Sequence, residues 1–382
     1  MPWKVAPVSE LRIALVHCVR TLGRSVTRAA REYGVSRKTA NKWLAVYDAH
    51  PDRPLVDRSR RPGRSPARTA ESLEQLILEV RRQFNWGPRK IHAYLRSRGG
   101  RGDDGLPSVR TVANILKRRG CVRPATPVHE EPQRFERPAP NDLWQVDHKG
   151  PVEVQRQKLM PLNVLDDHSR YCLAFEPLVD RTMARAWGVL WDVFGDVGLP
   201  DAILTDNAFN TMGLARPVGL SWFDARLVRL GIRPMHGRPY HPQTQGKVER
   251  LNGSADRELI DFNARRDSAE HFIADAHAWR HTYNHLRPHE ALGDQPPATR
   301  WRPSGRKRPA ELPTPAYPDG SLVRKVCQEG IVRFAGRRIL VGRGISSQPV
   351  RIEDHHDELK VFYCDHLLRS LSTDQLVKDR VL

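Results

Sequence analysis

The spacing of apolar residues predicts that the N-terminal third of the chain is helical. Through 8–50 and again through 71–121, apolar residues recur every three or four positions, which is the period of a helix with one buried face. The faces expected to be buried in the first helix of each group are Leu11, Leu15, Cys18 and Leu22, and Leu73, Leu76, Ile77, Val80 and Phe84. Helix starts are expected at Ser9, Ser25, Ser36, Pro88 and Ser108, with turns or helix ends at Gly34, Gly99 and Gly120. We therefore predict two groups of three helices.

Strand-like and helix-like patterns alternate through residues 141–300. Strands are expected at 143–150, 159–167, 171–178, 202–206 and 232–235, and helices at 181–195, 221–230, 245–262 and 268–285. A three-stranded meander followed by helices that alternate with strands predicts an α/β fold with a mixed sheet. Residues 320–382 contain five short β-like runs separated by turns, which predict a small β-barrel.

Three Pro- and Arg-rich stretches, at 51–70, 122–140 and 302–319, separate these patterns. Proline fixes φ and resists both helices and sheet ladders, so the three stretches are expected to be extended connectors. The predicted domains are 8–50, 71–121, 141–300 and 320–382.

Positive charge is concentrated at the N-terminal end of the 382-residue chain. The net charge of +19 divides into +16 for residues 1–140, −2 for 141–300 and +5 for 301–382. A basic arm joined to a neutral core that carries carboxylates indicates nucleic-acid binding coupled to a second activity. A generally Arg-rich composition is the alternative, but it would spread the charge evenly.

The five cysteines form no C-x-x-C pair, which argues against a structural zinc site and suits reduced thiols in a cytosol. No N-terminal segment resembles a signal peptide, and no run approaches the ~18 apolar residues of a membrane span. We expect a soluble, cytoplasmic protein associated with the nucleoid.

The first helical group has the spacing of a helix-turn-helix. Ala30, Gly34, Val35, Thr39 and Trp43 occupy the small, turn and buried positions of that motif. The residues predicted to reach DNA are Arg37, Lys38, Asn41 and Lys42 in this group, and Arg110, Asn114, Lys117 and Arg118 in a second helix-turn-helix. A plain three-helix bundle has a similar period, but the basic exposed face favours DNA binding.

Three carboxylates are candidates for a metal site. Asp147 and Asp206 each end a strand-like apolar run, and Glu249 lies just inside an expected helix start. Ligand sites in open sheets lie at the carboxyl ends of strands, and Mg²⁺ prefers oxygen ligands. Two Mg²⁺ ions held by these residues could act on a phosphodiester, while Lys247 and Arg250 contact DNA phosphates.

The alternative is that each aspartate is an ordinary cap or turn residue. Asp166 and Asp167 compete with Asp147 as metal ligands. We interpret them as turn residues, because the run Asp-Asp-His-Ser-Arg lies between two expected strands.

Several motifs together resemble the core of the DDE transposases of bacterial insertion sequences, which are relatives of retroviral integrases. They are Trp144-x-x-Asp147, LTDN at 204–207, HPQTQGKVER at 241–250, DHSR at 167–170 and YNHLRPH at 283–289. The resemblance covers 141–300 closely, and the run at 241–250 is its most specific part. It implies an RNase H-like mixed-sheet core, preceded by tandem all-α helix-turn-helix domains and followed by the small β-barrel.

The same resemblance implies a catalytic and metal-binding triad of Asp147, Asp206 and Glu249 with two Mg²⁺ ions, for which Mn²⁺ could substitute. The implied activity is cleavage and strand transfer of double-stranded DNA, with the inverted repeats at the element ends and a target DNA as partners. Because two ends must be held together, a homo-oligomer, dimer or larger, is expected on DNA.

The chain departs from the family pattern in two places. Asp206 and Glu249 are 43 positions apart, whereas the family has about 35 intervening residues, and we place the extra residues within 211–222. Ala208 stands where the family favours Gly. The zinc-binding His/Cys module of retroviral integrases is absent, and the helix-turn-helix units replace it.

Two other functions remain open from the residues alone. A DNA-binding regulator with an inactive, domesticated transposase core would keep the fold without the reaction, although all three carboxylates are present. An RNase H-type nuclease is disfavoured by the helix-turn-helix arm, because the major groove of an A-form hybrid is too narrow for side chains to read.

Overall fold

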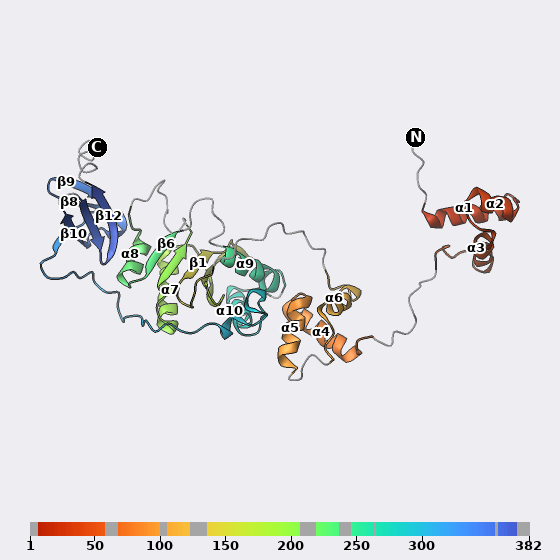
Figure 1. Ribbon diagram of the computed structural model, residues 1–382, viewed down its shortest axis with the longest axis horizontal. Coiled ribbons are helices and arrows are strands. Elements are labelled where there is room, and N and C mark those ends of the chain that lie inside the picture. The colour runs from red at the N-terminus through yellow and green to blue at the C-terminus, as the bar shows by residue number, and fades with distance from the viewer. Residues whose placement is uncertain are drawn as a thin grey trace. The chain divides into compact units, whose positions relative to one another are not determined.

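The computed structural model describes residues 7–57, 68–99, 105–122, 136–206, 219–236, 246–262, 264–355 and 358–372. Its contacts divide the chain into two compact units, Met1–Arg68 and Thr69–Leu382, and each is described by itself (Figure 1). Within the described residues, no helix combines the length and apolarity needed to cross a membrane.

The first unit is the predicted group of three helices: α1 (Val8–Arg20), α2 (Val26–Glu32) and α3 (Arg37–Ala49). Ser25 and Ser36 accept hydrogen bonds from main-chain N–H groups in the first turns of α2 and α3, so both predicted caps are confirmed. Gly34 takes a φ of +62° between these helices, a conformation that favours glycine. The predicted cap Ser9 is wrong, because α1 already begins at Val8 after Pro7.

The core of this unit is narrower than the apolar pattern predicted. Leu15 and Cys18 are buried, and Val16 joins them. Leu11 and Leu22 remain 43% and 55% exposed, so their predicted burial is wrong. Both lie away from the central stretch of α1 that packs against Ala30, Ala40 and Trp43.

The second unit begins with the other predicted helices: α4 (Glu71–Phe84), α5 (Pro88–Arg98) and α6 (Val109–Arg118). Pro88 opens α5 and Ser108 caps α6, as predicted. Stacked rings of Phe84 and Trp86, with centroids 4.3 Å apart, fill the core. Leu76 is 43% exposed, against prediction, and Leu78 is buried in the core beside Ile77.

The remaining elements belong to a mixed sheet with helices on both faces and to a C-terminal β region (Figure 1). The strands of the mixed sheet are β1 (Trp144–His148), β2 (Val152–Val154), β3 (Gln157–Asp166), β4 (Cys172–Leu178), β5 (Ala202–Thr205) and β6 (Arg233–His236). Its helices are α7 (Met183–Val197), α8 (Trp222–Arg229), α9 (Gly246–Ala255), the π-helical turn η3 (Asp256–Ile260) and α10 (Ala269–His285), followed by η4 (Glu290–Leu292) and η5 (Pro297–Thr299).

The main strands of the sheet run in the order β4-β3-β1-β5-β6. β4, β3 and β1 pair antiparallel, and β1, β5 and β6 pair parallel. This is the predicted RNase H-like mixed sheet. The short strand β2, which the sequence pattern missed, pairs with β3 as a hairpin.

The sheet separates two apolar layers. On one face, Trp144 and Val146 of β1 pack with α7 and α8, while α9 and α10 pack on the opposite face against β3 and β4. Because side chains alternate along a strand, Gln145 and Asp147 face the α9 side. A site built from the side chain of Asp147 at the end of β1 therefore lies on the face that α9 covers.

Residues 302–313, here called the strap, contain neither helix nor strand, as expected of a connector. They nevertheless bind the core. Arg306 donates hydrogen bonds to the carbonyl oxygens of Pro200, Leu230 and Gly231, and the Arg308 guanidinium lies 4.6 Å from the Trp191 ring centroid.

The C-terminal region contains β7 (Leu322–Lys325), β8 (Ile331–Phe334), β9 (Arg337–Leu340), η6 (Arg343–Ile345), β10 (Pro349–His355), β11 (Glu358–Tyr363) and β12 (His366–Ser372). Four strands form an antiparallel sheet in the order β12-β11-β10-β7, and β8 pairs with β9. β12 was not predicted. Among the described residues no ladder closes these sheets into one barrel, so the barrel stays a prediction.

The C-terminal β region shares its apolar core with α8. Leu220, Ala225 and Val228 pack in the same cluster as Val341 and Ile345. The main chains also meet closely, because a side chain at Gly219 would collide with the carbonyl of Val341. These residues bind the β region to the mixed-sheet core.

Candidate active site

Two of the predicted carboxylates lie at the ends of neighbouring parallel strands, Asp147 within β1 and Asp206 directly after β5. In the ladder between β1 and β5, Val146 lies opposite Thr205. Asp147 and Asp206 directly follow this pair along the chain, so their main chains lie side by side at the carboxyl ends. This is the edge of the sheet at which ligands bind in open α/β folds.

The third carboxylate is carried by α9. Val248, Leu251 and Ala255 bury one side of this helix against the sheet, which leaves Glu249 exposed. Its expected start at residue 245 and the rest of the motif at 241–245 lie outside the described residues. So do Ala208 and most of the segment 211–222 to which the extra residues between Asp206 and Glu249 were assigned.

A side chain that the sequence analysis did not single out connects α9 to β1. Asn252, one helical turn after Glu249, donates a hydrogen bond from Nδ2 to Oδ2 of Asp147 over 3.0 Å. Asn163, which pairs with Asp147 across β1 and β3, donates in turn to Oδ1 of Asn252. The i, i+3 spacing of Glu249 and Asn252 was the available signal, because it places both on one side of a helix.

The carboxylates affect one another electrostatically. Burial raises the pKa of Asp147 to about 6, and the charges of Asp206 and, more weakly, Glu249 add to this shift. The hydrogen bond from Asn252 opposes it by favouring the ionised form. Ionisation of Asp147 therefore has an electrostatic cost at this edge of the sheet.

The chemistry of the three side chains fits a divalent cation. Carboxylate oxygens are the ligands that Mg²⁺ prefers, and a cation would relieve the repulsion that raises the pKa of Asp147. In the described residues, however, no three His, Cys, Asp or Glu side chains are grouped closely enough to hold a metal ion. Asp147, Asp206 and Glu249 would have to move closer together to bind the same metal ion.

The residue before Asp206 is also fixed by side chains. Thr205 Oγ1 is hydrogen bonded to Nδ1 of His236 over 3.0 Å, and Nε2 of His236 lies 3.3 Å from Asp224. Asp224 caps α8 together with Ser221 in a reciprocal capping box. The end of β5 is thereby connected to β6 and to the start of α8.

Asp166 and Asp167 are both fully buried, which a turn assignment alone does not predict. Asp166 behaves as a turn residue: Oδ1 accepts hydrogen bonds from the main-chain N–H and the hydroxyl of Ser169. Asp167 instead accepts from long-range partners, Lys247 among them. Neither residue is grouped with the candidate triad in a metal-binding cluster.

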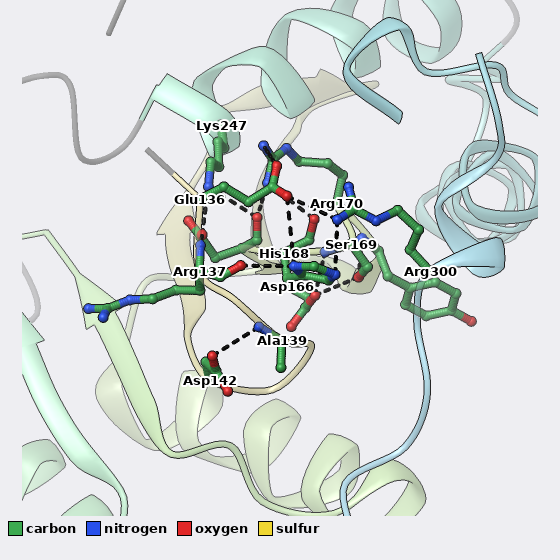
Figure 2. A network of polar contacts seen from close by, with 12 residues as sticks. Glu136, Arg137, Ala139, Asp142, Asp166, His168, Ser169, Arg170, Lys247 and Arg300 are labelled. Atoms are coloured by element: carbon green, nitrogen blue, oxygen red, sulfur yellow. Dashed lines mark hydrogen bonds and ion pairs between the residues drawn. The ribbon is translucent and has the colours of Figure 1, made fainter. Parts of the chain in front are cut away.

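Lys247 was predicted to contact DNA, but the structure uses it internally. Its side chain is only 12% exposed, and Nζ lies 2.6 Å from Oδ2 of Asp167 (Figure 2). The neighbouring Arg250 is exposed on α9, as a phosphate contact requires. Of the two basic residues that flank Glu249, only Arg250 is thus well placed to reach DNA.

The predicted DNA-contacting residues of the helical groups are exposed in the structure. They are Arg37, Lys38, Asn41 and Lys42 on α3, and Arg110, Asn114, Lys117 and Arg118 on or beside α6. Two are also occupied within their domains. Lys42 lies 3.5 Å from Asp57, and Arg118 pairs over 2.5 Å with the fully buried Glu74.

Two integrase core domain families match this part of the chain, at residues 137–242 and 230–297. A helix-turn-helix domain family matches residues 11–63, and a homeodomain-like domain family matches 39–116. The matches to the core cover the strands and helices that carry Asp147, Asp206 and Glu249.

The chain is similar to a curated protein of Xanthomonas euvesicatoria, the insertion element IS476 uncharacterized 39.2 kDa protein. The two are 28% identical over 248 residues, which are 61% of this chain. The match spans 65% of the relative's own length, a little under two thirds.

Solved structures with a similar trace include two viral proteins. One belongs to a simian T-cell lymphotropic virus intasome in complex with PP2A regulatory subunit B56 gamma, with 19% identity, a TM-score of 0.37, and coverage of 74% of this chain and 99% of that one. Another is the HTLV-2 integrase catalytic core domain in complex with magnesium, with 17% identity, a TM-score of 0.33, and coverage of 43% and 97%. These scores are too low to inform the function.

Proposed function

We propose that this chain, which joins helix-turn-helix domains to an integrase core, is a transposase that cuts the ends of its own insertion element and joins them to target DNA. The observation that supports this most directly is the parallel register that sets Asp147 beside Asp206, while α9, which carries Glu249, is joined to Asp147 through Asn252. The similarity to an insertion-element protein agrees with it.

The proposed metal ligands are Asp147, Asp206 and Glu249, which would hold two Mg²⁺ ions, with Mn²⁺ as a substitute. When bound, such ions activate an attacking oxygen and stabilise the leaving oxygen of a phosphodiester. Asn252 would orient the Asp147 carboxylate through its hydrogen bond to Oδ2. Arg250, exposed one residue after Glu249, would hold a DNA phosphate nearby.

The helical domains would recognise the inverted repeats. α3 presents its basic residues outward after the turn at Gly34, the arrangement with which a recognition helix enters a major groove. α6 presents Arg110 and Lys117 in the same way. Because strand transfer needs both element ends, the active form would be a dimer or larger assembly on DNA.

The decisive test uses a plasmid that carries the DNA flanking this coding region on both sides. With Mg²⁺, we expect 3′-hydroxyl nicks at the element boundaries and their transfer to a second DNA, and no reaction when the boundary sequences are scrambled. Binding without any cleavage would favour an inactive regulator. Preferential cutting of an RNA–DNA hybrid would favour a nuclease of the RNase H type.

Metal binding should weaken at acid pH. The pKa of Asp147 is about 6, so below this value a proton increasingly occupies the carboxylate that a cation needs. Calorimetric titration with Mn²⁺ should show affinity that is constant above about pH 7 and falls roughly tenfold per unit below about pH 6. Asp147→Asn, which has no titrating carboxylate at this position, should bind weakly without this pH dependence. Equal affinity at pH 5 and pH 8 in the unchanged protein would contradict the prediction.

Lys38 should contribute to DNA binding through phosphate contact alone. Removing one such contact releases one fewer counterion, so Lys38→Ala should weaken binding to all sequences and reduce the slope of log affinity against log salt by about 0.9. Fluorescence anisotropy at several salt concentrations measures both. Lys158→Ala is the control, because Lys158 is 65% exposed but lies at the start of β3. Loss of sequence preference in Lys38→Ala would instead indicate base contact.

A further inference from the structure

One buried carboxylate contacts both β1, which carries Asp147, and α9, which carries Glu249. Asp167 lies in the turn between β3 and β4 and is fully buried. Its Oδ1 accepts a hydrogen bond from Gln145, and its Oδ2 pairs with Lys247. Gln145 precedes Asp147 by two residues on β1, and Lys247 precedes Glu249 by two residues on α9.

The contact to β1 lies on the same side of the strand as Asp147. Residues two apart on a strand share a face, so the side chains of Gln145 and Asp147 both face α9. Gln145 is 1% exposed, and its Nε2 donates to Asp167 over 2.7 Å. A shift of Asp167 would therefore displace the strand that carries Asp147.

The contact to α9 is a charge-assisted pair at the first turn of the helix. Nζ of Lys247 lies 2.6 Å from Oδ2 of Asp167 and also donates to the main-chain oxygen of Asp167 over 3.1 Å. Buried hydrogen bonds between charged groups are short and directional. They fix the first turn of α9 directly after the segment 237–245, which lies outside the described residues.

The turn that carries Asp167 is itself held in place. The main-chain N–H of Arg137 donates to Oδ2 of Asp167 over 2.8 Å, and the Arg137 carbonyl lies 2.8 Å from Nδ1 of His168. Glu136 pairs with Arg170 and with Arg300 from beyond η5 (Figure 2). Asp167 is thus a fixed point to which Lys247 and Gln145 are attached.

We infer that Asp167 and Lys247 are positioning residues that set the separation of Asp147 and Glu249 and thereby the affinity of the triad for its metal ions. The inference rests on the proposed function. The plainer alternative is a buried ion pair that stabilises the fold and leaves metal binding unaffected. Residues behind the ligands of a metal site typically change metal affinity 10- to 100-fold when they are replaced.

The test is Mn²⁺ binding to the full chain without DNA, measured by calorimetry beside the thermal midpoint in EDTA. Asp167→Asn and Lys247→Met should each weaken Mn²⁺ binding by about 10- to 100-fold. The double variant Asp167→Asn/Lys247→Met should weaken it no further than either single change, because both remove the same connection. If the single variants do not fold, Asp167→Leu/Lys247→Met, which leaves no unpaired buried charge, takes their place.

The control variant is Asp275→Asn, which removes a more exposed ion pair of similar length to Arg265 on the same catalytic core. It should bind Mn²⁺ as the unchanged protein does. Lys247→Arg, which retains the charge, should recover part of the lost affinity. Variants with lowered thermal midpoints but Mn²⁺ affinity within about twofold of the unchanged protein would overturn the positioning role and leave the proposed function intact. If the protein without substitutions binds no Mn²⁺, both the positioning role and the proposed function are overturned.

Discussion

Asp147→Asn, Asp206→Asn and Glu249→Gln should each lower DNA cleavage and strand transfer at least about a thousandfold, which corresponds to about 4 kcal/mol of lost transition-state stabilisation. Each change removes one negative charge while keeping the shape of the side chain. The remaining two carboxylates could not complete the ligand set for two ions. The assay is the plasmid reaction with flanking DNA, followed by the amount of nicked and joined product.

Binding to the element ends should remain within about twofold in all three variants, because the predicted DNA-reading helices α3 and α6 are unchanged. Asp256→Asn is the matched control. Asp256 lies in η3, which continues α9, and its side chain is 44% exposed beside Lys149. Combining two of the triad changes should cost little more than one. Strand transfer retained by Asp147→Asn or Glu249→Gln would rule out the assigned triad.

Arg287→Met should lower the free energy of unfolding by about 3–5 kcal/mol, because it leaves the buried Glu258 without its main counter-charge. Nε of Arg287 donates to both carboxylate oxygens of Glu258, at 3.0 and 2.9 Å, and each side chain is less than 10% exposed. Nη2 of Arg287 also donates to Ser254 over 2.9 Å. Denaturant unfolding followed by tryptophan fluorescence measures the change.

The double variant Glu258→Gln/Arg287→Met should recover most of the lost stability, since it removes both buried charges of the pair. Lys90, 3.6 Å from Glu258, keeps some influence, and burial lowers its pKa to about 8. The matched control is Arg265→Met, which breaks a pair whose arginine is 53% exposed and should lower the free energy of unfolding far less than Arg287→Met does. Equal losses of stability in Arg287→Met and Arg265→Met would show that burial does not determine how much the Arg287 pair contributes to the free energy of unfolding.

The sheet and the placement of the carboxylates could be predicted because local patterns determine them. β5 is a short buried apolar run, and β1 has the alternation that directs Gln145 and Asp147 to one face. Strand ends follow directly from where such runs stop, so Asp147 and Asp206 were found without knowledge of the fold. The serine caps at Ser25, Ser36 and Ser108 are equally local.

Residues whose role depends on distant partners could not be predicted. Asp167 resembles an exposed turn residue until Lys247, 80 positions later, is brought against it. Lys247 in turn resembles a phosphate contact because its counter-charge is remote in sequence. The exposure of Leu11 and Leu76 has the same origin: period alone cannot show how much of a helix its neighbours cover.

Only the end of the stretch 211–222, to which the extra residues between Asp206 and Glu249 were assigned, belongs to the described residues. Part of the interval is α8 and β6, which are regular elements of the core. Leu220 and Ser221, at the end of the longer stretch, are engaged by the C-terminal β region and by the cap of α8. Leu220 and Ser221 are therefore integrated into the packing, and the assignment of the extra residues to 211–222 stays a prediction.

The shared apolar core of α8 and the C-terminal β region has a practical consequence for anyone expressing parts of this protein. The sequence suggests a fragment boundary near residue 300, where the predicted core ends. A fragment that stopped there would lose the strap and expose Leu220, Ala225 and Val228 to water. Exposed apolar surface of this kind favours aggregation. The smallest fragment expected to remain well behaved in solution extends through β12, to Ser372.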